Sequence, residues 1–171
     1  MTVTLDTNIF IDKAELRAGA MNFDKILELA REETLSLWYT STTDFEINHP
    51  EALRIITRLV QEGVLHEDLN AGTGRDYMPG GPGLHRVEEE QIDKLTEGIW
   101  PNADVSGFSY ESKRRDSCHL LSHKLNKRDI FLTRDRDILA KRPTIKKILE
   151  ISILSPEELL LTLTSGQTAT L

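Results

Sequence analysis

Four acidic side chains stand where strands are expected to end or helices to begin: Asp6, Glu46, Asp116 and Asp135. Asp6 and Asp135 each follow a short apolar run, whereas Glu46 and Asp116 fall in the early turns of expected helices. Clustered carboxylates raise one another's pKa, so a protein keeps such a group mainly where a cation neutralises it. Hard cations such as Mg²⁺ or Mn²⁺ prefer carboxylate and water oxygen. The four acids therefore predict a site where one or two divalent cations activate water for attack on a phosphodiester.

A parallel sheet would bring these acids together, because the carboxyl ends of its strands meet at one edge. Strand and helix patterns alternate along the chain, which predicts an α/β fold, a three-layer α/β/α sandwich with a mostly parallel central sheet. Strands are expected within residues 2–12, 36–42, 129–133 and 151–154, and helices near 23–30, after Thr43, and over 52–63, 85–100, 109–126, 144–150 and from Pro156.

The charge of the chain is unevenly distributed, although its net value is −7. Residues 106–150 carry 12 basic and 6 acidic side chains, whereas residues 1–105 carry 9 and 20. A basic segment inside an acidic protein can hold a phosphate backbone locally. The alternative is a solvated helix face. The candidate RNA-binding side chains lie beside two of the acids: Lys113, Arg114, Arg115 and Arg134.

Composition points to a cytoplasmic protein that has no contact with membranes. The single cysteine, Cys118, cannot form an internal disulfide, which agrees with a reducing compartment. The N-terminus shows no secretion-signal pattern, and no apolar run reaches the roughly 18 residues that span a bilayer. A chain of 171 residues with 39% hydrophobic residues fits one domain over residues 1–171.

Three stretches, VTLDTNIFID (3–12), TSTTDFEI (40–47) and RRDSCHLLSHKLNKRDIFLTRDRDIL (114–139), together resemble the PIN-domain ribonucleases. This family includes the toxins of many bacterial and archaeal toxin–antitoxin pairs. The resemblance implies an endoribonuclease in which Asp6, Glu46, Asp116 and Asp135 bind Mg²⁺ or Mn²⁺. Asn8 and Thr133 match the family's supporting polar positions. Asp137 competes with Asp135 for the last acidic position, and Asp135 is preferred because it comes sooner after the strand.

The resemblance covers about residues 1–60 and 106–160 and leaves a longer middle. Residues 64–105 are therefore expected to be an insertion that shapes substrate entry or a protein contact. Within it, residues 70–83 hold five of the ten glycines and predict a loop. The expected partners are an RNA substrate, an antitoxin-type inhibitor protein and a second copy of the chain.

Plainer interpretations compete with this one. The chain could keep the fold as a catalytically silent binding or scaffold module, or it could be another metal-dependent phosphate hydrolase, such as a phosphatase or a DNA nuclease. His119 and His123 stand one helical turn apart near Asp116 and could instead form a zinc site. Asp12 is expected to face solvent.

Overall fold

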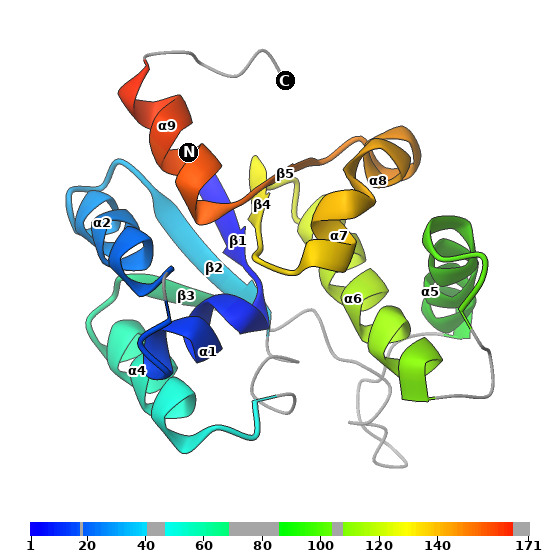
Figure 1. Ribbon diagram of the computed structural model, residues 1–171, viewed down its shortest axis with the longest axis horizontal. Coiled ribbons are helices and arrows are strands. Elements are labelled where there is room, and N and C mark those ends of the chain that lie inside the picture. The colour runs from blue at the N-terminus through cyan, green and yellow to red at the C-terminus, as the bar shows by residue number, and fades with distance from the viewer. Residues whose placement is uncertain (18, 41–46, 69–85, 104–107, 166–171) are drawn as a thin grey trace.

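The computed structural model describes residues 1–17, 19–40, 47–68, 86–103 and 108–165 (Figure 1). Within this part of the chain, five strands form one sheet in the order β3-β2-β1-β4-β5, and every neighbouring pair is parallel. The expected α/β class with a parallel sheet is thus confirmed. The strands are β1 (Thr2–Leu5), β2 (Ser36–Thr40), β3 (Leu65–Asp68), β4 (Ile130–Leu132) and β5 (Ser152–Leu154).

Helices pack on both faces of the sheet, as crossover connections between parallel strands require (Figure 1). One face carries α1 (Thr7–Ala14), α2 (Ala20–Arg31), α4 (Pro50–Gln61) and α9 (Pro156–Thr164). The other face carries α5 (Arg86–Ile99), α6 (Phe108–Leu125), α7 (Arg136–Ala140) and α8 (Arg142–Leu149). None of the described helices is both long and apolar enough to cross a membrane.

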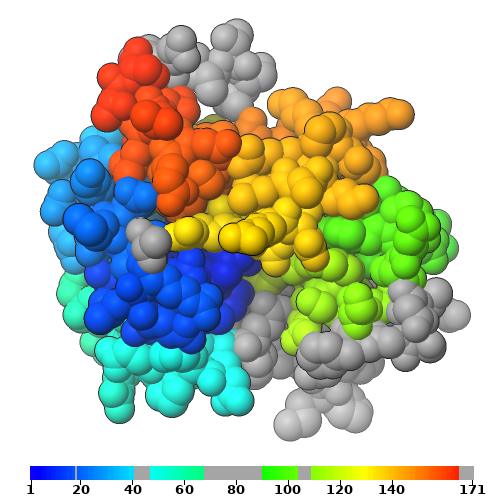
Figure 2. Space-filling model, in the orientation of Figure 1, coloured from blue at the N-terminus to red at the C-terminus, as the bar shows by residue number. Residues whose placement is uncertain are grey.

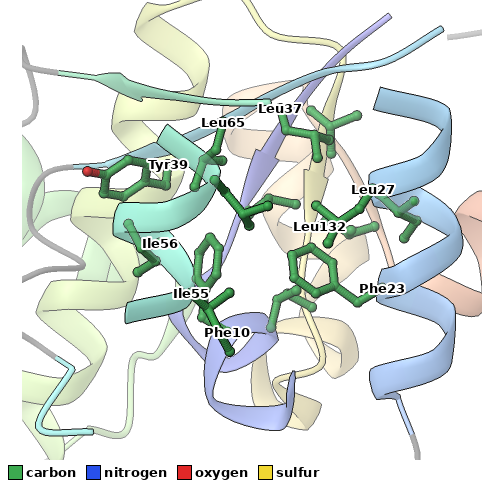
Figure 3. Close-up of a cluster of buried hydrophobic side chains, with 14 of the residues drawn as sticks. Phe10, Phe23, Leu27, Leu37, Tyr39, Ile55, Ile56, Leu65 and Leu132 are labelled. Atoms are coloured by element: carbon green, nitrogen blue, oxygen red, sulfur yellow. The ribbon is translucent and has the colours of Figure 1, made fainter. Parts of the chain in front are cut away.

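The first face is an apolar core, which we call the apolar face (Figure 3). Phe10 of α1 lies at its centre, with its ring centroid 5.9 Å from that of Phe23 and 6.3 Å from that of Tyr39. Both ring pairs meet edge to face, the arrangement that aromatic quadrupoles favour. Leu37 and Leu132 point from the strands into the same cluster and are fully buried. This packing fixes α1 against the sheet directly after Asp6.

The second face, which we call the α6 face, is chemically mixed. Apolar residues, among them Leu120 and Phe131, fill the space between β4–β5 and helices α5 to α8. Over β1 and β2, by contrast, α6 binds the sheet through two buried histidines. His119 Nδ1 lies 2.6 Å from Thr40 Oγ1 and His123 Nδ1 lies 2.8 Å from Thr4 Oγ1, the latter with Thr4 and His123 both fully buried.

Strand β3 lies in the segment that the sequence analysis treated as an insertion without a strand. It pairs with β2 from Leu37↔Leu65 to Thr40↔Asp68 and forms an edge of the sheet. Only Leu65 of this strand is buried among its described side chains, and His66 is exposed. Edge strands with polar side chains lack the apolar alternation that identifies strands in a sequence. The middle of the chain therefore completes the sheet before any insertion begins.

Candidate functional site

The carboxyl ends of β1 and β4 lie side by side, because these strands are parallel neighbours (Figure 1). Leu5 is in register with Leu132, and the backbone N–H of Asp6 donates to the Leu132 carbonyl at 3.0 Å. The residues that follow the two strands, Asp6 on one and Thr133 to Asp135 on the other, are thereby brought together from opposite ends of the sequence. This is the placement expected for Asp6 and Asp135 at one edge of the sheet.

Asp6 is the N-cap of α1 and is only 7% exposed. Its Oδ1 accepts a hydrogen bond from the backbone N–H of Thr7 at 2.8 Å. Its Oδ2 accepts from Asn8 Nδ2 at 2.6 Å and from Thr133 Oγ1 at 2.5 Å. A helix follows the strand directly, as the polar pair Thr7-Asn8 indicated, and its cap is Asp6 itself. A buried carboxylate with this many donors is held in one orientation.

Asn8 and Thr133 connect the two strand ends. Thr133 Oγ1, besides donating to Asp6, accepts from the backbone N–H of Asp135 at 2.9 Å and from Asn8 Nδ2 at 3.2 Å. Asn8 Oδ1 accepts from the backbone N–H of Arg134 at 3.0 Å. The Thr133 hydroxyl and the Asn8 amide can each donate and accept hydrogen bonds, so each contacts partners of both kinds. The two residues expected to be supporting thus fix the chain on both sides of Asp6.

Asp135 is the N-cap of α7 and is half-buried. Its Oδ1 accepts from the backbone N–H groups of Asp137 at 2.7 Å and Ile138 at 3.1 Å. Oδ2 accepts no hydrogen bond from the described residues, so this oxygen keeps its capacity for a further ligand.

Asp116 approaches the same edge from α6. The pKa of its carboxyl is raised to about 7, first by burial and then by the like charges of Asp6 and Asp135, while Lys113 and His119 act in the opposite direction. The charge of Asp116 is therefore coupled to both strand-end acids. Three of the four expected acids belong to one electrostatic cluster, and Glu46 lies outside the described residues.

Lys113 stands between this cluster and α7. Its Nζ lies 2.8 Å from Asp137 Oδ2 and 3.4 Å from Asp116 Oδ2. Burial acts to lower the pKa of Lys113, but Asp137, Asp116 and Asp135 outweigh it and raise the value above its ordinary range. The same ion pair lowers the pKa of Asp137. Asp137, an expected supporting residue, thus pairs with the lysine, and its own side chain is 68% exposed.

The other candidate RNA-binding residues differ in what they contact. Arg134 Nε lies 3.3 Å from Asp12 Oδ2, and its guanidinium packs so closely on Gly19 that an added Cβ would lie 1.6 Å from Nη1. Figure 2 shows the yellow segment after β4 lying against the blue N-terminal helices. Arg114 Nε is 2.8 Å from Asp93 Oδ1 and joins α6 to α5. Arg115 is half-buried and forms no ion pair within the described ranges.

Asp12 does not face solvent, and that expectation was wrong. The residue is 8% exposed, because Arg17 and Arg134 both pair with its carboxylate, at 3.1 Å and 3.3 Å. The hydrophobic pattern marks Asp12 as polar, and the sequence gives no sign that Arg134, 122 positions away, helps to bury it.

Histidines 119 and 123 bind threonines on two different strands. Burial lowers the pKa of His123 to about 3, and the neighbouring charge of Arg128 acts in the same direction, so its imidazole is neutral. Among the described residues, no group of three or more His, Cys, Asp and Glu side chains is placed to hold a metal ion, and this includes Asp6, Asp116 and Asp135 as well as the two histidines. The described residues therefore form no complete ligand set for either the zinc alternative or the expected Mg²⁺ or Mn²⁺ site. The signal in the sequence for the role of these histidines is the pair Thr4 and Thr40, a polar residue in each of two apolar strands.

The sequence matches no known family model, and its comparison with curated proteins likewise gave no match.

Proposed function

We propose that the chain is a metal-dependent endoribonuclease of the PIN type. The observation that carries the proposal is the hydrogen-bonded network of Asp6, Asn8, Thr133 and Asp135 across two neighbouring strand ends, with the Asp116 charge coupled to it. An ordinary helix cap needs one carboxylate and one or two backbone donors. Here the N-caps of α1 and α7, Asp6 and Asp135, both form a hydrogen bond with Thr133 Oγ1, which helix capping alone does not require.

The chemistry of these side chains fits a divalent cation. Mutual repulsion and burial hold the pKa of Asp116 near 7, and a cation beside it would relieve both effects. Asp6, Asp116 and Asp135 would hold the ion, with Glu46 as the fourth expected ligand. When bound, Mg²⁺ or Mn²⁺ supplies an activated water and stabilises the negative charge that develops on a phosphodiester.

The protein's own contribution is positioning. Asn8 and Thr133 orient the Asp6 carboxylate, and the first turn of α7 orients Asp135. Lys113 lies at the border of the cluster, where its charge would attract a phosphate toward the acids. Thr133 and Asn8 are positioning residues, because they act through the carboxylates.

The test is cleavage of a single-stranded RNA in Mn²⁺ or Mg²⁺, before and after addition of EDTA. The parent should cleave only with metal, and Asp6→Asn should lose activity by about a hundredfold or more. Asp24→Asn is the matched control, since Asp24 is an exposed acid on α2 that pairs with Lys13. Cleavage that survives chelation, or an equal loss in both variants, would contradict the metal mechanism.

The two other classes of function give different outcomes in the same assay. Single-stranded DNA and a small phosphate ester, offered beside RNA, would identify a DNA nuclease or a phosphatase by faster turnover of those substrates. RNA binding without cleavage would identify a silent binding module. A toxin role, an inhibitor protein and a homodimer rest on the resemblance of the sequence alone, and the cytoplasm rests on composition.

A further inference from the structure

A small cavity lies on the α6 face beside Lys113 and has a volume of about 230 Å³. Its walls come from the end of α5, the start of α6 and the junction of α7 with α8. The lining residues are Trp100, Pro101, Asn102, Ala103, Ser109, Lys113 and Lys141. Two lysines, an amide and a hydroxyl line this cavity, and none of the lining residues in the described part of the chain is acidic.

The cavity adjoins the acidic cluster through Lys113. The Nζ of this lysine lies 5.3 Å from the centroid of the Trp100 ring on the cavity side and 2.8 Å from Asp137 Oδ2 on the other. Lys141 is close enough for its charge to lower the pKa of Asp137. A group held in the cavity would therefore lie within reach of the same lysine that contacts Asp116.

The two lysines differ in how their charges are used. Lys113 already has two carboxylate partners, Asp137 and Asp116. Lys141 is half-buried and has no ion-pair partner in the described part of the chain. Ser109 lies in the first turn of the 18-residue α6, where backbone N–H groups carry partial positive charge. A cavity with one uncommitted cation, a hydroxyl and an amide is suited to a phosphate oxygen rather than to a cation or an apolar group.

We propose that this cavity binds a phosphate of the RNA strand next to the scissile one, with Lys141 as its main charged contact. The inference rests on the proposed function and extends it, because it assigns the strand a direction past the acids toward Trp100. The lining residues that follow α5 belong to the middle segment of the chain, so this segment shapes the path of the substrate.

The experiment uses Trp100 as the reporter. The chain has two tryptophans, so Trp38→Phe leaves Trp100 as the only one. The probes are a 5′-phosphorylated uridine dinucleotide, the same dinucleotide with a 5′-hydroxyl, and inorganic phosphate, each titrated in EDTA. The phosphorylated dinucleotide should change Trp100 fluorescence, and Lys141→Gln should weaken this binding by about five- to tenfold. Lys147→Gln removes the same charge from an exposed site on α8 and should change binding less than about twofold.

Calorimetric titration of Lys141→Gln and Lys147→Gln with Trp38 intact repeats the comparison if the Trp38→Phe background folds poorly. If the phosphorylated dinucleotide binds more tightly than inorganic phosphate, the cavity binds a phosphate of a nucleic-acid strand, as proposed. If inorganic phosphate binds more tightly, the cavity is a site for a free anion and the proposal is overturned. Equal effects of Lys141→Gln and Lys147→Gln, or a silent Trp100, also overturn the inference.

The cleavage assay separates this inference from the proposed function. RNA cleavage that is equally fast in Lys141→Gln and Lys147→Gln at subsaturating RNA would leave the nuclease intact and overturn the phosphate cavity. Lys141-dependent binding in a protein that cleaves no RNA would instead reject the nuclease and keep a phosphate site.

Discussion

The two faces of the sheet hold their helices by different means. On the apolar face, α1, α2, α4 and α9 pack through aliphatic and aromatic side chains, with Phe10 at the centre. On the α6 face, the strands β1 and β2 present Thr4 and Thr40, and α6 meets them with His123 and His119. The carboxylate of Asp116 stands one turn before His119 on the same helix.

The apolar face therefore contributes mainly to the stability of the fold, whereas the α6 face determines the position of a helix. Apolar burial is non-directional, so it stabilises the fold without specifying where a helix lies along the sheet. Hydrogen bonds are directional, and a buried one that is broken leaves an unpaired polar group. The two histidines therefore fix the position of α6, and with it the position of Asp116 relative to Asp6. Four predictions test this division.

The largest effect is expected at the acidic cluster. Asp116→Asn should reduce RNA cleavage by about a hundred- to a thousandfold. In EDTA its thermal melting temperature should equal or exceed that of the parent, because one of three mutually repelling charges is removed. Millimolar Mg²⁺ should then stabilise the parent more than the variant. A variant that melts well below the parent in EDTA, with equal metal shifts for both, would make Asp116 a structural residue.

A truncation on the apolar face should affect stability alone. Phe10→Ala should lower the free energy of unfolding by about 3–5 kcal/mol, because Phe10 is fully buried and contacts two other rings. Urea unfolding at constant pH measures the loss, and Mn²⁺ titration of the folded variant measures the site. If metal affinity fell in proportion to stability, the apolar face would also be placing the acids.

A smaller loss is expected when the hydroxyl of Thr4 on the α6 face is removed. Thr4→Val keeps the shape of the side chain but leaves His123 Nδ1 without its hydroxyl partner and removes the acceptor of Arg128 Nη1 at 3.3 Å, which should cost about 1–3 kcal/mol. Thr162→Val is the control, since that hydroxyl bonds only to the carbonyl of Glu158 within its own helix. Urea unfolding of both variants gives the comparison. Equal losses would mean that the threonine–histidine contact adds nothing to the placement of α6.

The smallest effect is a dependence of stability on pH that His123 should contribute. Its folded pKa of about 3 lies below the ordinary histidine value of 6.5, so between these values the unfolded chain binds a proton that the native chain does not. Stability from this group is thus fully present above pH 6.5 and falls with pH, by about 1.4 kcal/mol per unit below 6.5. His123→Gln lacks this dependence, so its disadvantage relative to the parent should shrink from pH 7 to pH 5. A difference that stays constant in urea unfolding at pH 7, 6 and 5 would show that His123 is protonated in the native state.

Much of the fold could be predicted from the sequence because most strands are short apolar runs that end in polar residues. Strands β1, β2, β4 and β5 and helices α5, α6 and α9 lie close to their expected positions. The short helix α7 was missed, since its five residues are too few to show a period. Strand β3 was missed because its pairing with β2, and not its own pattern, makes it a strand.

The residues of the candidate site could be predicted where they directly follow a strand that the sequence identifies. Asp6, Asn8, Thr133 and Asp135 follow runs that the sequence identifies as strands, and parallel pairing brings them together. The ion pairs were not predictable, because Arg114 with Asp93 depends on how α6 packs against α5, and Arg134 with Asp12 on how the segment after β4 packs against α1. For the same reason, Trp100 and Lys141 carried no signal in the sequence.

The shared hydrogen bond between Asp6 and Thr133 also has a consequence for the order of folding. Its two residues are 127 positions apart, and β1, the first strand to be synthesised, occupies the middle of the sheet beside β4. Contacts at such separation form late, since a long loop must close before they contribute. During synthesis the N-terminal helices can gather on β1 and β2 while the neighbour of Asp6 does not yet exist. A growing chain therefore carries an incomplete acidic cluster until residue 135 has been made, and the proposed nuclease activity could not begin before that point.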